Sequence, residues 1–334
     1  MKKFLVVCAA SLLLCLSGKA QEFTRVPEAD EPGRSVGLSV IPRLDLNYNG
    51  DFTLGDSSLY SLLEGDISDV FSFSVCNHWL ASDTETIGLL YKNTGRSDDV
   101  NWLDWAYLTC ALGGFSITLG KQPITFGGFE FDAYDFESFS FLNSSVWNNF
   151  QVYQWGAKFG WANESENTTL SFQATTSPYG EYPVASKLFN YALEWRGDYG
   201  HFRNIWSAVA VQRDGDFFPL LSFGQEFDLS DSFTVGLDVF DAVADENNPL
   251  MKGVSMFPSI RFNPSERFMI RGRLGGELNL NNDNKNLIAG IDGFWFPIKG
   301  NDSLRLHFAG GYRHDEKLYS ATIGAIYYLN FISK

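Results

Sequence analysis

The chain has 334 residues, of which 45% are hydrophobic and 16% aromatic, and its formal net charge is -15. Mean hydropathy is nonetheless slightly negative, at -0.12, because apolar positions alternate with polar neighbours. The acidic balance argues against nucleic acid as a partner, since affinity there depends on neutralising phosphates. Beyond the amino terminus, no stretch approaches the roughly 18 consecutive apolar residues of a membrane helix.

The amino terminus has the pattern of an export signal. Two lysines precede an apolar run from Phe4 to Leu16, and Gly18-Lys19-Ala20 supplies the small residues that a signal peptidase recognises. We therefore predict a cleaved signal peptide over residues 1–20. Cys15 would suit a lipid anchor, but the residue before it is too large for that signal. Residues 21–35 are polar and contain two prolines, which predicts a flexible lead-in.

After the lead-in, the chain alternates apolar with small or polar residues in short stretches. In 318–331, for example, Tyr319 and Ile323 share one face, while Ser320 and Thr322 lie on the other. A period of two indicates a β-strand, and two unlike faces indicate two different solvents. An apolar face needs either a second sheet or lipid, and only a membrane barrel meets lipid.

We predict an all-β fold, a transmembrane antiparallel β-barrel over residues 36–334 with about sixteen strands, in a range of 14 to 18. The predicted strands centre on Leu44, Leu62, Phe73, Trp105, Ile117, Trp155, Phe172, Leu193, Ala208, Leu221, Val235, Met256, Ile270, Ile291, Leu306 and Ile323.

Long and short connections alternate between these strands. Residues 82–101, 121–149 and 177–187 are long, whereas 112–114 and 197–200 are short. Long outer loops and short inner turns at opposite ends are typical of outer-membrane barrels. By this count 121–149 is the third outer loop, and it is the longest connection.

Aromatic residues lie near the predicted strand ends. Trp161, Trp195 and Trp295 fall at the end with short turns, and Trp79 and Tyr319 at the other. Amphipathic rings collect where hydrocarbon gives way to headgroups. This placement favours a membrane barrel over an exported soluble β-protein.

Two of the four cysteines, Cys76 and Cys110, remain after the signal. They fall on neighbouring predicted strands but are offset along the strand axis, so two free thiols are favoured over a disulfide.

One stretch carries a family resemblance. Gly113–Gly128 combines a short turn, a strand and the tripeptide Gly-Lys-Gln, and leads through Phe-Gly into the long loop. This motif and the overall architecture resemble the outer-membrane general diffusion porins, particularly the porin O and P type. The resemblance implies a barrel of sixteen to eighteen strands, often a homotrimer, whose third outer loop folds inward to narrow the pore. Phosphate selectivity would need a dense basic cluster, which this acidic chain does not obviously supply.

The long loop carries the predicted site, an acidic pore constriction. Its carboxylates are Glu130, Asp132, Asp135 and Glu137, set among aromatic residues that can anchor the loop. Strand parity places seven basic residues on the pore wall: Arg43, Lys158, Arg196, Arg203, Arg271, Arg273 and Arg305. A basic wall opposite an acidic loop sets up a transverse field that favours small dipolar solutes.

Two less specific interpretations stay open. The loop acids can be ordinary solvated residues, and the arginines can pair with nearby Asp45, Asp104, Glu194 or Asp238 to avoid isolated charge. Where the loop acids dominate, we expect a modest preference for cations that fades as salt rises.

The sequence thus predicts a water-filled outer-membrane channel for passive diffusion of small hydrophilic solutes and ions in a Gram-negative cell. A closed barrel acting as a surface receptor or adhesin is the alternative. No Gly-x-Ser-x-Gly, His-Glu-x-x-His or glycine-rich phosphate loop occurs, so we expect no enzyme, cofactor or metal site. Expected partners are outer-membrane lipid, lipopolysaccharide and the barrel-assembly machinery.

Overall fold

The computed structural model describes residues 35–81, 103–150, 152–180, 187–244, 250–280, 285–314 and 316–333. The predicted signal peptide and all of the lead-in except Ser35 lie outside these residues. No helix in the described ranges is long and apolar enough to cross a membrane.

Strands make up nearly all of the regular structure. They are β1 Ser35–Tyr48, β2 Phe52–Thr53, β3 Ser58–Asp66, β4 Phe71–Ala81, β5 Leu103–Leu112, β6 Phe115–Pro123, β7 Tyr153–Ala162, β8 Thr168–Thr176, β9 Phe189–Asp198, β10 Phe202–Arg213, β11 Asp216–Ser230, β12 Phe233–Val243, β13 Met251–Ser265, β14 Phe268–Asn279, β15 Lys285–Trp295, β16 Leu304–Arg313, β17 Leu318–Tyr327 and β18 Leu329–Ser333.

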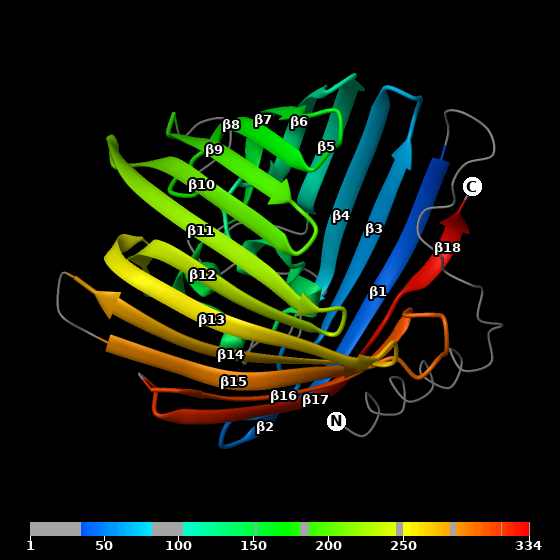
Figure 1. The fold of residues 1–334 in the computed structure, drawn as a ribbon, viewed down its shortest axis with the longest axis vertical. Helices are drawn as coiled ribbons and strands as arrows, with labels where there is room; N and C mark the ends of the chain where they lie inside the picture. The colour runs from blue at the N-terminus through cyan, green and yellow to red at the C-terminus, as the bar shows by residue number, and fades with distance from the viewer. Residues whose placement is uncertain are drawn as a thin grey trace.

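The strands form one antiparallel sheet that closes into a barrel (Figure 1). Strand β1 pairs with β3 on one side and with β17 and β18 on the other, where Arg43 faces Ile326 and Gly37 faces Ser333. β2 has only two residues, and β18 continues β17 after Tyr328. The described residues therefore form sixteen long barrel strands, each containing one predicted centre, and the predicted fold class is confirmed.

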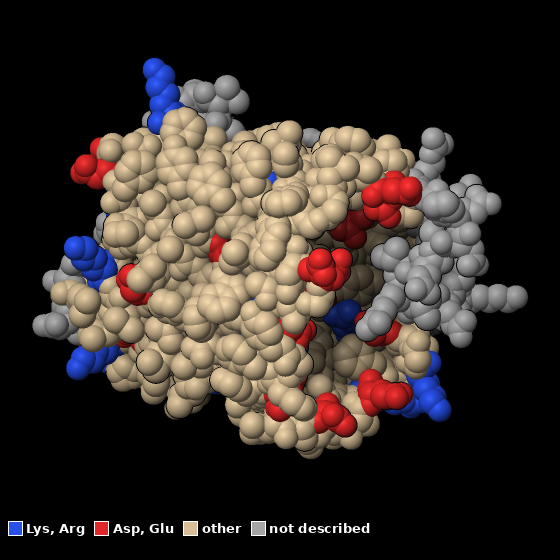
Figure 2. Space-filling view, turned by 45° about the horizontal axis from the view of Figure 1, so that its top comes forward, with Lys and Arg blue, Asp and Glu red and all other residues tan. Residues whose placement is uncertain are grey.

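The two faces of each strand meet different surroundings. In β9, Tyr191, Leu193 and Trp195 are exposed on the outside, while Ala192 and Glu194 point inward. Charged side chains gather at the two ends of the barrel and in a hollow at one end, and the flank between carries few (Figure 2). An apolar outer band around a polar interior is the pattern of a barrel immersed in lipid.

A row of bulky apolar side chains crosses the outer face of β6–β11. The register places Phe115, Trp161, Leu170, Trp195, Trp206 and Phe223 side by side, each opposite the next. On β6–β9 this row lies near the end that carries the short turns.

Connections alternate in length between the two ends. Residues 113–114, 199–201 and 231–232 are short turns at one end, and the long connection 124–152 between β6 and β7 lies at the other. The hairpin at Asp214-Gly215 is an exception at the long-loop end. Both of its residues have positive φ, 50° and 95°, as a tight turn matched to strand twist requires.

Both remaining cysteines are free thiols, as predicted. Cys76 faces Trp105 and Cys110 faces Phe71, so five residues of register separate the two cysteines along β4 and β5. Cys76 is buried, but Cys110 is only half-buried.

Candidate functional site

The connection 124–152, hereafter the inward loop, lies inside the barrel. It contains three short 3-10 turns, Glu130–Asp132, Asp135–Glu137 and Ser140–Leu142, followed by the helix α2 over Ser145–Asn149. The hydroxyl of Ser144 caps α2 by accepting a hydrogen bond from Trp147 N at 3.1 Å. Turns this tight point side chains in every direction, so the loop packs against the wall on several sides.

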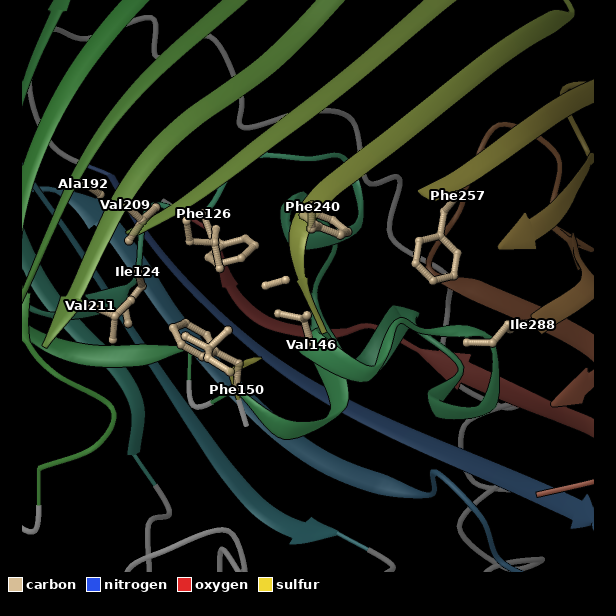
Figure 3. Close-up of a cluster of buried hydrophobic side chains, with 13 residues drawn as sticks. Ile124, Phe126, Val146, Phe150, Ala192, Val209, Val211, Phe240, Phe257 and Ile288 are labelled. Atoms are coloured by element: carbon tan, nitrogen blue, oxygen red, sulfur yellow. The ribbon is translucent and has the colours of Figure 1, made fainter. Parts of the chain in front are cut away.

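Apolar side chains hold both ends and the middle of the inward loop to the wall. In one cluster Phe126, Val146 and Phe150 pack against wall residues that include Phe240 and Phe257 (Figure 3). The Phe126 and Phe240 ring centroids are 5.7 Å apart. Burial of each such side chain contributes about 1.5–3 kcal/mol.

A second cluster fixes the middle of the loop. Phe136, Phe139 and Leu142 of the loop are at most 4% exposed and pack against wall residues that include Ile41 and Phe294. The two clusters fasten the loop to opposite parts of the barrel, the first to β9–β15 and the second to strands on both sides of the β1–β17 seam. The loop is therefore a packed internal element of the barrel.

Wall side chains also satisfy the loop backbone. Asp238 accepts hydrogen bonds from Phe129 N at 2.8 Å and Glu130 N at 3.1 Å. Glu277 accepts one from Ser145 N at 2.7 Å. These bonds replace the water that the loop amides lose on entering the barrel.

Two of the predicted loop acids pair with wall arginines at buried or half-buried positions. Glu130 lies 2.8 Å from Arg273, and their side chains are 2% and 16% exposed. Glu137 accepts a hydrogen bond from Arg305 at 2.5 Å and another from the hydroxyl of Tyr328 at 2.5 Å.

Asp132 also pairs with an arginine, but at a solvent-exposed position. It lies 2.7 Å from Arg196, and both side chains are 43% exposed. The side chain of Asp135 lies outside the described residues. In these three pairs the loop acids contact the wall arginines that face them, because an isolated charge in a confined interior is costly to desolvate. Their role as a pore constriction stays a prediction.

The remaining predicted basic residues do not meet the loop acids. Arg43 pairs with Asp45 at 2.7 Å and donates a hydrogen bond to the carbonyl oxygen of Ser138 at 2.6 Å. Arg203 lies 2.9 Å from both Glu226 and Asp228.

Arg271 lies 2.7 Å from Asp292. Within the described part of the chain Lys158 makes no ion pair, although Glu194 acts on it electrostatically. The sequence offers several acids as partners for the wall arginines. Asp45 does pair with Arg43, and Glu194 lies 3.7 Å from Arg196. Asp104 instead lies 3.7 Å from His78.

Two cavities lie along one side of the inward loop. The outer cavity, about 280 Å³, is lined by residues near the start of β7 and the end of β6, at the long-loop end. The inner cavity, about 310 Å³, is lined by residues near the short turns, among them Asn167 and Arg203. Asp132 and Arg196 line both cavities. Their ion pair therefore stands where the two cavities meet.

Solved structures share the fold of this chain. The outer membrane channel DcaP of Acinetobacter baumannii covers 93% of this chain and 100% of its own, with a TM-score of 0.62 and 14% identity. Two mutants of the Rh. blastica porin each cover 88% of this chain and 100% of their own at 13% identity, with TM-scores of 0.60 and 0.59. The chain has the porin fold. At this identity the likeness shows the fold alone; no family model and no curated protein matches the chain.

The sequence pattern predicts only some of the wall residues that bind the inward loop. Lumen parity marked Arg196, Arg273 and Arg305 correctly as inward-facing. Glu277 was missed, and Asp238 was considered only as an arginine partner, although it accepts loop N–H groups. Their inward-facing positions in the strand alternation are the signal that could find them, because a polar residue inside the barrel needs a hydrogen-bond partner there.

Proposed function

We propose that the protein is an outer-membrane porin that passes small hydrophilic solutes and ions by passive diffusion. The observation that carries the proposal is a closed barrel with an apolar outer band whose charged interior is narrowed by a packed inward loop. A lipid-facing surface with a polar lumen is the arrangement that lets water-soluble molecules cross a membrane.

The proposed route runs past Asp132 and Arg196. The buried clusters and the Glu130–Arg273 pair fasten the inward loop elsewhere on the wall, whereas the two cavities are lined by strands between β5 and β13. Charged groups exposed at a narrow point attract polar solutes and reject apolar ones. Of the predicted constriction residues, Asp132 therefore faces the proposed route together with Arg196. Glu130 and Glu137 hold the loop in place.

This proposal places the barrel in the outer membrane of a Gram-negative cell. Its partners would be membrane lipid, lipopolysaccharide and the assembly machinery that inserts such barrels, and three copies would associate as the family resemblance implies. Under this proposal the protein is a channel and not an enzyme.

Single-channel recording tests the proposal. Mature protein refolded in detergent should migrate differently on gels before and after boiling, because a closed hydrogen-bonded barrel has no edge from which to unravel. In planar bilayers it should give discrete conductance steps. Deletion of Glu130–Phe141 should raise the step size, because the loop occupies the lumen. A folded barrel without conductance would instead support the receptor or adhesin alternative.

A further inference from the structure

The outer cavity has the size of a site for one small molecule. It lies between β5–β9 and the loop segment 131–134 and has a volume of about 280 Å³. Pockets that hold drug-sized ligands span roughly 300–1,000 Å³. The outer cavity therefore suits a single small ring.

The charges that line the outer cavity balance. Lys158 and Arg196 are positive, and Asp132 and Glu194 are negative. Arg196 lies 2.7 Å from Asp132 and 3.7 Å from Glu194. An ionic ligand would compete with one of these contacts and leave a charge uncompensated. A neutral ligand that both donates and accepts hydrogen bonds would not.

Aromatic rings form another part of the wall. Tyr134, which is 43% exposed, lines the cavity together with Tyr107 and Tyr153. Trp105 and Phe136 both stack on Tyr134, with ring centroids 5.8 and 5.0 Å away and planes 18° and 12° apart, so Tyr134 contributes its exposed edge and hydroxyl to the cavity. Such rings offer flat apolar faces with a polar rim.

An unsatisfied amide marks the same cavity. Gln122 is 1% exposed and lines the cavity, and its Nε2 donates a hydrogen bond to Gly156 O at 3.1 Å. Within the described ranges its Oε1 has no hydrogen-bond partner. Buried acceptors are rarely left unpaired, so this oxygen points to a donor supplied by a ligand or by water.

We propose that the outer cavity is a binding subsite for one neutral sugar ring on its way through the channel. A pyranose ring presents C–H groups to aromatic faces and hydroxyls at its edge, which matches the aromatic wall and the hydroxyl-seeking groups around it. The hydroxyls donate to Gln122 Oε1, Asp132 and Glu194 and accept from Lys158. This inference rests on the proposed function, because the subsite lies on the proposed route.

Ion-current recording with added solutes tests the subsite. Glucose should reduce the single-channel current in a saturable way. Sorbitol, an acyclic polyol, should lower the current only in proportion to viscosity. Benzoate, an anionic ring, should change it only as far as the bulk conductivity changes. Saturable block by benzoate without block by glucose would overturn the proposal in favour of an anionic ring, and equal block by sorbitol would remove the need for a ring.

Variants separate the subsite from the channel as a whole. Tyr134→Ala should raise the half-blocking glucose concentration about fivefold, which corresponds to the loss of one aromatic contact of about 1 kcal/mol. Tyr134→Phe keeps the ring and should restore most of the block. Gln122→Met should weaken the block by a similar factor. Tyr319→Ala, on the outer surface at 74% exposure, is the matched control and should change neither.

Two measurements keep failure of the subsite distinct from failure of the channel. Conductance in salt without glucose block would overturn the subsite and leave the porin proposal standing. If no conductance is seen, isothermal titration of the refolded barrel with glucose still decides the subsite, because binding does not require flow. If the titration shows no saturable binding heat, the subsite proposal is overturned in that case as well.

Discussion

Two ion pairs of the inward loop have nearly the same length and opposite surroundings. Glu130 and Arg273 are 2.8 Å apart and mostly buried, whereas Asp132 and Arg196 are 2.7 Å apart with both side chains 43% exposed. A buried charge depends on its partner for solvation, while an exposed charge also has water. The same chemistry therefore fastens the loop on its sealed face and leaves an exposed pair of charges on its open face, beside the proposed route.

Breaking the buried pair should have the largest effect. Glu130→Ala leaves Arg273 buried without its partner, which costs about 3–5 kcal/mol, and also removes the acceptor for Ser144 N. The loop should leave the wall often, and single-channel recording should show larger, noisier currents. Asp231→Ala, at an exposed turn, controls for loss of an acid. Quiet currents of unchanged size would show that the pair does not fasten the loop.

Removing one apolar contact from the sealed face should cost somewhat less. Leu142 is 4% exposed and packs where Gly290 and Gly311 leave room in the wall; a Cβ added at Gly311 would lie 2.7 Å from Leu142 Cδ2. Leu142→Ala should cost about 2–5 kcal/mol of docking stability. Proteolysis of the loop in the refolded barrel should report the loss as faster cleavage.

A second substitution sharpens that test. Adding Gly311→Ala to Leu142→Ala places a methyl group in the space that Leu142 vacates, which should recover about 0.8 kcal/mol. In the parent chain the same Gly311→Ala should destabilise docking by overpacking, about 1–3 kcal/mol. Destabilisation of equal size in both backgrounds would mean that the two positions do not share this contact.

The difference between the two loop faces is hidden from the sequence. Period-two alternation predicts each strand, because residues such as Leu193 and Glu194 face different solvents, and that rule is local. Glu130 and Asp132 stand two positions apart in one acidic run. Whether each is buried depends on tight turns and on arginines far along the chain, such as Arg273. Inward parity could therefore name the wall residues but could not match them to loop acids.

The open face can be tested through charge. Asp132→Asn should change stability by no more than about 1 kcal/mol, because the pair is exposed. It should nevertheless shift the reversal potential in a low-salt gradient towards anions, since Asp132 lies on the proposed route. Neutralising Glu130, Asp135 and Glu137 as well, to Asn or Gln, should shift the reversal potential further towards anions. That variant also breaks the buried Glu130–Arg273 pair, so Asp132→Asn alone isolates the open face.

Salt provides the internal check on that measurement. The screening length falls from about 30 Å at 0.01 M to about 3 Å at 1 M, so the shift from Asp132→Asn should shrink as salt rises. A reversal potential equal to that of the parent at low salt would remove Asp132 from the route and return attention to the arginine wall.

The smallest effect that we expect is a pH dependence of loop docking on the sealed face. Asp56, between β1 and β3, lies 3.6 Å from Arg43 Nη2 and 3.5 Å from Ser140 N of the inward loop. Burial, with the neighbouring charge of Asp45 adding to it, raises the pKa of Asp56 above the ordinary carboxyl value of 3.8 despite the opposing effect of Arg43. The folded state therefore holds this proton more tightly than the unfolded state does.

The sign of the pH effect follows from that raised pKa. The stabilisation by the Asp56 proton is complete below the unfolded pKa and is lost as pH rises through the folded pKa. Acidification across this range should tighten the loop and lower current noise, as long as other carboxylates stay paired. Asp56→Asn imitates the protonated form, so its noise should be low already and depend less on pH. If parent and variant channels follow the same noise-against-pH curve, Asp56 does not report on loop docking.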